Sequence, residues 1–563
     1  MGQRTGPPPE HDPDVAAYAT HAVTNQAPPL VGHDLAADPV LLAALDREGA
    51  GHAADSLHAF GRRLGSAQVQ HWATQANEHP PVLHTHDRYG HRLDEVEFHP
   101  AWHELMAMSI GAGLAGVPWA DQRPAPHVVR AGGFFLASQV EAGHGCPLSM
   151  TYAIVPALRH APDLAAELEP LLATRSYDPS LVPPTSKAGL VAGMGMTEKQ
   201  GGSDVRVNTT RAVPCADGSY RLVGHKWFTS APMSDLFLVL AQAPGGLSCF
   251  LLPRVLPDGT RNAIRLQRLK DKLGNRSNAS SEIELQAAVA HRVGAEGRGV
   301  ATILDMVVHT RLDCVIGSAA TQRAALVAAV HHARHRRAFG ALLVDQPAMT
   351  NVLADLAIES EAATLLAFRL AGAVDRAASG DRLENAFRRL ATAVGKFSVC
   401  KRTPTVVAEA LECLGGNGYV EDSGLPRLFR ESPLNSIWEG SGNVNALDVL
   451  RALRRDPDSW EAVHAELTVA SGADRRYDVA LQQLDAAVTA QADAEPEVAQ
   501  AGARRLVQSL ALVLQASLVL RYAPAEVADA FCGTRLGTGP GILGMLPTAP
   551  SAHARIVARC LPS

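Results

Sequence analysis

A double motif between residues 193 and 230 constrains the fold and chemistry of this chain more than any other stretch. Residues 193–204, GMGMTEKQGGSD, contain a glycine pair and several hydroxyl side chains. Because glycine has no Cβ, the backbone N–H groups there can approach a ligand closely. Residues 225–230, HKWFTS, form a strand-like run that ends in aromatic rings beside two hydroxyls. A ring that lies against a flat cofactor, with hydroxyl donors next to it, is what a flavin site needs.

The composition is that of a large globular protein. At 563 residues the chain is too long for one hydrophobic core and predicts several domains. Apolar residues make up 47% and charged residues 19%, and the net charge of −6 restricts any nucleic-acid surface to a local patch. The eight cysteines are scattered, with no Cys-x-x-Cys, and predict reduced thiols in a cytoplasmic protein. We expect no membrane association, because no uncharged apolar run is long enough to span a bilayer.

Changes in sequence pattern divide the chain into four regions. Residues 1–190 predict a helical domain with a long Pro-rich N-terminal extension. Residues 191–293 alternate apolar and polar positions between turn residues, which predicts a small antiparallel β barrel or sandwich. Residues 294–454 keep apolar residues at helical spacing over long segments and predict a helical bundle. Residues 455–563 predict an additional helical domain, so the fold class is mainly α with a small antiparallel β domain.

The double motif resembles the flavin-binding signature of the acyl-CoA dehydrogenase family. The succession of helical domain, β domain and bundle over about residues 40–450 is similar to that family's architecture. The sequence MTEKQGGSD, in place of the family's usual MTEPxAGSD, resembles the AidB branch of the family, the alkylation-response flavoproteins. Members of that branch carry an extra C-terminal domain. The resemblance implies FAD as the cofactor, with contacts from Met196, Thr197, Gly202, Ser203, Trp227, Thr229 and Ser230.

A second motif, SIWEGSGN at residues 436–443, resembles the loop that carries the catalytic base of the family, which here is Glu439. Removing a proton α to a thioester needs a carboxylate whose basicity is raised by burial, and the ring of Trp438 can supply an apolar wall. Some family members place the base just before the arginine that here is Arg311. Thr310 occupies that position and cannot act as the base, which supports Glu439. Taken alone, a glutamate at this position would more often cap a helix or pair with an arginine, and only the full motif favours its role as the base.

Three further segments resemble FAD and substrate contacts of the family. Residues 336–340, RRAFG, resemble a motif that reaches the FAD of a neighbouring subunit, which implies a homotetramer; on residue types alone they fit an ordinary helix C-terminus equally well. Gly415 and Gly416 resemble the turn beneath the FAD pyrophosphate, or simply end a helix. Arg311 resembles an arginine that contacts the nucleotide part of an acyl-CoA, or is a structural partner of Asp313 or another acid. The resemblance also implies FAD contacts for Arg336, Phe339, Gln346, Ser441 and Asn443.

The resemblance implies α,β-dehydrogenation of a short or branched acyl-CoA, with Glu439 as base and FAD as the hydride acceptor. A DNA-binding flavoprotein that protects against alkylation, with vestigial dehydrogenase activity, is the main alternative, and a structural tetramer that holds FAD without turnover is a third. The region 455–563 favours the DNA alternative, but its arginines are offset by acidic residues. We therefore expect at most weak, sequence-independent binding of duplex DNA. Candidate positions for that surface are Arg504, Arg505, Arg555 and Arg559.

Histidine clusters give no metal site. The run from His84 to His91 predicts a solvated turn, because no further ligands follow at suitable spacing. His331 and His335 lie one helical turn apart, but no third ligand is evident, so a solvated helix face is the better interpretation.

Overall fold

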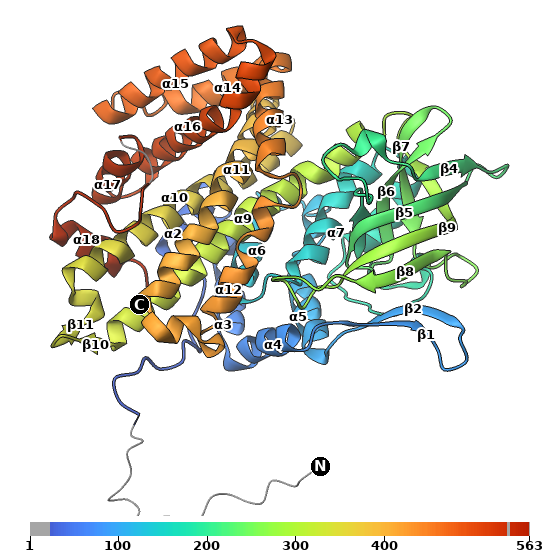
Figure 1. Cartoon of the computed structure of the whole chain (residues 1–563), viewed down its shortest axis with the longest axis horizontal. Helices are drawn as coiled ribbons and strands as arrows, with labels where there is room; N and C mark the ends of the chain where they lie inside the picture. The colour runs from blue at the N-terminus through green and yellow to red at the C-terminus, as the bar shows by residue number, and fades with distance from the viewer. Residues whose placement is uncertain (1–22, 538–540, 562–563) are drawn as a thin grey trace, which may run out of the picture.

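The computed structural model describes residues 23–537 and 541–561. Figure 1 shows that these residues form three adjacent parts. Long helices form the centre of the molecule, a β domain lies at one side of them, and the C-terminal helices cover the opposite side. The helical regions and the β domain follow one another along the chain as the sequence predicts. Residues 1–22, where much of the Pro-rich extension falls, lie outside the described residues.

The N-terminal region is helical except for one β-hairpin. The hairpin is the part that the sequence did not predict: its turn falls on the run from His84 to His91, but the flanking residues form two paired strands. These residues are mostly polar, so they lack the apolar alternation that marks a strand. Arg92 donates to the carbonyl of Leu266 at 3.0 Å, which joins the hairpin to the β domain. The elements are α2 (Pro39–Arg47), α3 (Ala54–Leu64), α4 (Ala67–Glu78), β1 (Val82–His86), β2 (Arg92–Glu97), α5 (Pro100–Gly111), α6 (Pro126–Val140), α7 (Gly145–Leu158) and α8 (Pro162–Leu172).

The β domain is one seven-stranded sheet that closes on itself. Its ladder runs β6–β4–β5–β9–β7 and returns from β7 to β6, while β3 adds to β6 and β8 adds to β9. All pairings are antiparallel except those of β3 and β4 with β6. Large apolar side chains such as Phe237, Phe250 and Leu222 fill the interior. The strands are β3 (Ala192–Gly195), β4 (Arg211–Pro214), β5 (Tyr220–Ser230), β6 (Leu236–Ala243), β7 (Gly246–Pro253), β8 (Ile264–Leu269) and β9 (Ser280–Val293).

Three long helices form the bundle, and local signals set where they begin. Pro347 occupies the first turn of α10, where its missing N–H would have no partner anyway. Asp381 caps α11 by accepting from the N–H groups of Leu383 and Glu384. The three helices pack on one another through a continuous apolar core. The elements are α9 (Gly299–His335), β10 (Arg337–Ala338), β11 (Ala341–Leu342), α10 (Pro347–Ala378), α11 (Arg382–Cys413), α12 (Leu425–Glu431) and α13 (Gly442–Arg455).

The C-terminal region packs tightly onto the bundle. Its longest helix, α16, contacts α10, α11 and α13. By length and composition α16 is the one helix among residues 23–537 and 541–561 that could cross a membrane; 67% of its most apolar window is buried inside the protein. Its apolar character is therefore accounted for by packing. The helices are α14 (Pro457–Thr468), α15 (Arg475–Asp493), α16 (Pro496–Tyr522), α17 (Ala525–Arg535) and α18 (Pro550–Ala558).

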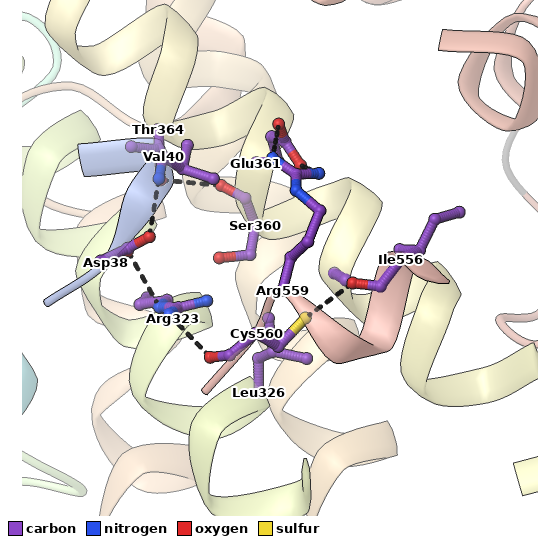
Figure 2. A pocket seen from close by; sticks show the side chains of 11 residues that line it. Asp38, Val40, Arg323, Leu326, Ser360, Glu361, Thr364, Ile556, Arg559 and Cys560 are labelled. Atoms are coloured by element: carbon purple, nitrogen blue, oxygen red, sulfur yellow. Dashed lines mark hydrogen bonds and ion pairs between the residues drawn. The ribbon is translucent and has the colours of Figure 1, made fainter. Parts of the chain in front are cut away.

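The residues that directly follow the last helix join the C-terminal end of the described chain to its N-terminal part, as Figure 2 shows. Arg323 of α9 pairs with Asp38, the N-cap of α2, at 3.0 Å and donates to the carbonyl of Cys560 at 2.7 Å. Beside it, Arg559 forms a two-bonded ion pair with Glu361 of α10. These contacts hold segments from both ends of the chain against the same pair of bundle helices.

Candidate functional site

The two halves of the double motif meet in the structure. The N–H of Trp227 in β5 donates to the carbonyl of Thr197, just beyond β3, at 2.8 Å. A Cβ at Gly202 would lie 2.6 Å from the Thr197 hydroxyl, so only glycine fits there without a shift. Thr229 is 1% exposed, and its hydroxyl has no hydrogen-bond partner within the described chain. A buried polar atom without a partner is costly unless a ligand satisfies it, so this hydroxyl fits a bound cofactor.

A bulge in β5 sets the position of the Trp227 ring. The register between β5 and β9 shifts between Lys226 and Thr229, which leaves Trp227 and Phe228 off the ladder. Bulges of this kind redirect side chains beside functional sites. The Trp227 ring is half-buried, and the Lys270 ammonium lies 3.4 Å from its centroid. The ring is thus held at the end of the strand while part of it stays exposed.

A buried ion pair, which the sequence analysis did not find, holds the same loop. Lys226 of β5 pairs with Glu198 at 2.7 Å, and both side chains are fully buried. Glu198 also accepts from the N–H groups of Thr209 and Thr210. Burial acts to raise the pKa of Glu198, but the Lys226 ammonium and these donors hold that pKa well below its usual range. Both residues lie inside the double motif, but the pairing is set by the strand arrangement.

Glu439 lies in a loop that is fastened from two helices. Its backbone is left-handed, with φ of 57°, and the following Gly440 has φ of 96°. Its carboxylate accepts from the Thr310 hydroxyl of α9 at 2.7 Å. Its carbonyl accepts from Arg311 at 2.9 Å. From α11, the buried Lys396 ammonium donates to the carbonyls on both sides of Glu439, those of Trp438, at 2.6 Å, and Gly440.

The Glu439 carboxyl group has the electrostatics of a base. Desolvation raises its pKa, while the Thr310 hydroxyl, Lys396 and Arg311 act in the opposite direction without cancelling it. Carboxylates whose pKa is raised by burial are frequent at functional sites. The residue keeps some exposed surface, so a reactant can reach it.

The Glu439 loop and the double motif lie next to each other. Trp438 packs on the same apolar cluster as Met194 and Met196. The buried Cys146 thiol links the two more directly: burial raises its pKa to about 12, the charge of Glu439 adds to this, and a hydrogen bond with Ser230 opposes it. The structure therefore brings the end of β5 and the predicted base to one place.

Lys396 is the clearest functional candidate that the sequence analysis missed. It is 1% exposed, although lysine is almost never fully buried without partners. Its sequence neighbours, residues 393–400, are otherwise apolar or small, AVGKFSVC. A single lysine inside such a run is the sequence signal that could have identified Lys396 as a functional candidate.

Arg311 has partners within the chain. It pairs with Asp448 of α13 at 2.9 Å in addition to its bond with the Glu439 carbonyl. Asp313, its suggested partner, pairs with Arg130 of α6. A structural role with another acid is thus what the structure shows, and the contact of Arg311 with a substrate stays a prediction.

Five of the remaining predicted FAD residues, Arg336, Phe339, Gln346, Gly415 and Gly416, do not lie at this site. The β10–β11 hairpin, which holds Phe339, is at the end of the bundle away from the β domain (Figure 1). Phe339 is 99% exposed at the tip of the β10–β11 hairpin, with φ of 52°. Arg336 donates to the carbonyl of Asn25, and Gln346 donates to the carbonyl of Ala338. Gly415 and Gly416 face open space, since an added Cβ would meet no atom within 4 Å at either position. Within one chain, this group does not contribute to the site around Glu439.

Ser441 and Asn443 lie at the N-terminus of α13, directly after the Glu439 loop. Ser441 is the N-cap, but its side chain makes no capping hydrogen bond. Asn443 is exposed and accepts from Arg504 of α16 at 3.4 Å.

For metals, residues 23–537 and 541–561 contain no group of three His, Cys, Asp or Glu side chains that could hold an ion.

Comparison with known proteins places these features in a family. Three family profiles match the chain in succession: the AidB N-terminal domain at residues 25–179, the acyl-CoA dehydrogenase middle domain at 193–288 and the acyl-CoA dehydrogenase C-terminal domain at 297–454. The AidB protein of Escherichia coli (strain K12) is 48% identical over 531 residues, which is 93% of this chain and 96% of that protein. Acyl-CoA dehydrogenase family member 11 of Caenorhabditis elegans is 36% identical over 71% of this chain and 66% of its own length.

Two solved structures have the same fold as this protein over nearly the whole chain. The crystal structure of C. elegans ACDH-11 in complex with C11-CoA superposes with a TM-score of 0.83 at 28% identity, and covers 97% of this chain and 95% of that one. The structure of Bd2924 in its apo form has a TM-score of 0.80 at 30% identity and covers 91% of this chain and 100% of that one.

Proposed function

The chain belongs to the acyl-CoA dehydrogenase family of FAD-dependent oxidoreductases, and from that premise we propose that it desaturates the α,β bond of an acyl-CoA with Glu439 as the base. The main support for this proposal is the environment of the Glu439 carboxyl group. Its pKa is raised by desolvation, its loop is held from two helices, and it lies beside the end of the double motif.

The residues around the double motif fit FAD. The unpartnered Thr229 hydroxyl can bond to the flavin ring, the half-buried Trp227 ring can pack against it, and the Gly202 turn lets the backbone approach closely. When bound, FAD supplies the acceptor for the hydride that leaves the β-carbon of the substrate.

The side chains of this chain handle the proton. The Glu439 carboxylate takes it from the α-carbon, and the desolvated surroundings favour the neutral acid that results. The Thr310 hydroxyl holds one carboxylate oxygen and so orients the group. Arg311 holds the carbonyl of Glu439, and Lys396 holds the carbonyls on both sides of it. These bonds limit the motion of the base and so lower the entropic part of the barrier.

An acyl-CoA as the substrate class is supported by ACDH-11, whose structure contains C11-CoA. A short or branched acyl chain remains our proposal for this protein. The test is anaerobic titration of the holoenzyme with straight acyl-CoAs from four to twelve carbons and with branched ones, following the loss of flavin absorbance.

Glu439→Gln is the decisive variant. It should retain FAD, because Ser441, Asn443 and the double motif are unchanged, and should reduce the rate of flavin reduction by about 10²–10⁴-fold. Glu461→Gln, an exposed position on α14, is the matched control and should react at the parental rate. If Glu439→Gln also reduced its flavin at that rate with a good substrate, Glu439 would not be the base.

Protection of DNA remains the alternative function, and the ion pairs of the C-terminal region weaken it. A phosphate-binding face needs free cations, and both Arg555 and Arg559 are paired with acids. A salt series of duplex-DNA binding by the whole protein distinguishes the two functions, because a phosphate surface gives binding that falls steeply as salt rises. The paired arginines of this region and their partners are Arg476 with Asp474 and Asp529, Arg521 with Glu466, Arg535 with Asp355 and Glu359, Arg555 with Glu526, and Arg559 with Glu361.

We also propose a homotetramer, in which residues 336–340 reach a neighbouring subunit. The support is the Phe339 ring, which is 99% exposed although it is large and apolar. Its backbone is left-handed, a conformation that is rare for a bulky residue and typical of functional positions.

A further inference from the structure

Two cations from separate regions of the chain meet at the first turn of α13. Arg504 belongs to α16 of the C-terminal region, and Lys401 to α11 of the bundle. Arg504 donates to the side-chain oxygen of Asn443 at 3.4 Å. The Lys401 ammonium would lie 3.2 Å from a Cβ placed on Gly442. Both side chains therefore reach the segment that directly follows the Glu439 loop.

The positive charge at this turn is not balanced by acids. Across the described residues, no acidic side chain lies within 4.0 Å of the charged nitrogens of Lys401, Arg504 or the nearby Lys396, although ion pairs with carboxylates are frequent elsewhere. Desolvation lowers the pKa of Lys401, and the charges of Arg504 and Lys396 lower it further. Most other arginines of the C-terminal region point toward carboxylates. This cluster differs from them in having like charges together.

The backbone at the same turn also favours an anion. The side chain of Ser441 makes no capping hydrogen bond, and the first turn of α13 contains no acidic residue. The first N–H groups of a helix have no partner within the helix, and its dipole places positive charge there. Free N–H groups beside unpaired cations are the usual composition of a phosphate site.

We infer that Lys401, Arg504 and the N-terminus of α13 bind a diphosphate group, so that the C-terminal region completes the cofactor site of its own subunit. The inference rests on the proposed function, in which Ser441 and Asn443 contact FAD. Arginine can hold two phosphate oxygens at once, and a diphosphate carries enough charge to offset the cluster. Coenzyme A contains the same diphosphate group, so the ligand is FAD or the substrate.

The inference assigns Arg504 to the small-molecule site instead of to a DNA surface. Its neighbour Arg505 is exposed on the same helix, and the structure shows no ion pair or side-chain hydrogen bond for it among the described residues. The two arginines thus form a matched pair: one reaches the cluster and the other does not.

The test measures ligand affinity and needs no turnover. Apoprotein of the wild type, Arg504→Gln and Arg505→Gln is titrated with FAD, and the corresponding holoenzymes are titrated with free coenzyme A. Loss of one charge-assisted hydrogen bond should weaken the affected ligand about 10-fold or more in Arg504→Gln, while Arg505→Gln matches the wild type. Lys401→Gln should weaken the same ligand, and apoprotein melting temperatures close to that of the wild type would show that all three variants fold.

The outcomes separate this inference from the proposed function. Weaker FAD binding identifies the cofactor diphosphate, and weaker coenzyme A binding with unchanged FAD binding identifies the substrate diphosphate. If the wild type bound FAD and Arg504→Gln bound both ligands equally tightly, the inference would be wrong and the proposed function would stand. A wild type that bound no FAD would instead contradict the proposed function itself.

Discussion

Glu439 and Phe339 have the same backbone conformation and opposite surroundings. Each is a non-glycine residue with positive φ, 57° and 52°, and each precedes a glycine that also has positive φ. The Glu439 turn is held by side chains from α9 and α11 that bond to its carboxylate and to three successive carbonyls. The Phe339 ring is 99% exposed.

From this difference we expect the Glu439 turn to function within one chain and the Phe339 turn to function between copies of the chain. A strained conformation persists only where its surroundings impose it, and the Glu439 loop has those surroundings within one chain. The exposed Phe339 ring has no such packing within the described chain, so we expect its role to depend on another copy of the chain. Breaking each turn separately tests this distinction.

Of the variants that test this distinction, Lys396→Met should have the largest effect, because it removes the ammonium that holds the Glu439 loop from α11. The carbonyls of Trp438 and Gly440 then lose a donor, and the base is free to move. A displacement of about 1 Å at a reacting group costs roughly 10²-fold in rate, so flavin reduction per bound FAD should slow by about that factor. Rapid-mixing measurements normalised to bound flavin exclude an effect of simple FAD loss. A parental rate would show that Lys396 has no positioning role.

A smaller effect, on affinity and assembly together, is expected for Arg336→Ala. If the hairpin reaches the FAD of another subunit, the variant should bind FAD about 10-fold more weakly and melt at a lower temperature, because a ligand bound only by the folded state stabilises it. Arg382→Ala, an exposed position at the start of α11 outside this hairpin, is the control and should change neither quantity. Light scattering coupled to size-exclusion chromatography reports the assembly. A monomer with full FAD occupancy would remove the distinction between the two turns.

The smallest effect is a shift in pH dependence for Thr310→Val. The Thr310 hydroxyl donates to the Glu439 carboxylate, which stabilises the charged form and lowers its pKa. Without that bond the pKa, already raised by desolvation, rises further. The base works only when it is deprotonated, so the rate falls as pH drops through this pKa, and the fall should begin at higher pH in the variant. A lost hydrogen bond of about 1 kcal/mol corresponds to roughly 0.7 pH unit. The pH profile of flavin reduction measures the shift, and a profile that coincides with the parental one would mean that this bond does not tune the base.

The order of elements could be read from the chain because local patterns determine it. Apolar residues at helical spacing marked residues 294–454 as long helical segments, and α9 and α10 are such helices. Alternation between turn residues marked 191–293 as a β domain. The β1–β2 hairpin escaped because its strands are mostly polar, and its contact with Leu266 comes from a segment more than 170 residues away.

The family resemblance, the flavin motif and Glu439 as the predicted base could all be found without a structure, since they depend on residues that are close together in the chain. Only the tertiary structure showed that Lys396 holds the Glu439 loop, that Arg311 is paired with Asp448, and that a C-terminal arginine reaches α13. Those contacts join residues between 42 and 137 positions apart. No local pattern encodes such pairings, because they follow from how the helices pack and which polar groups that packing buries together.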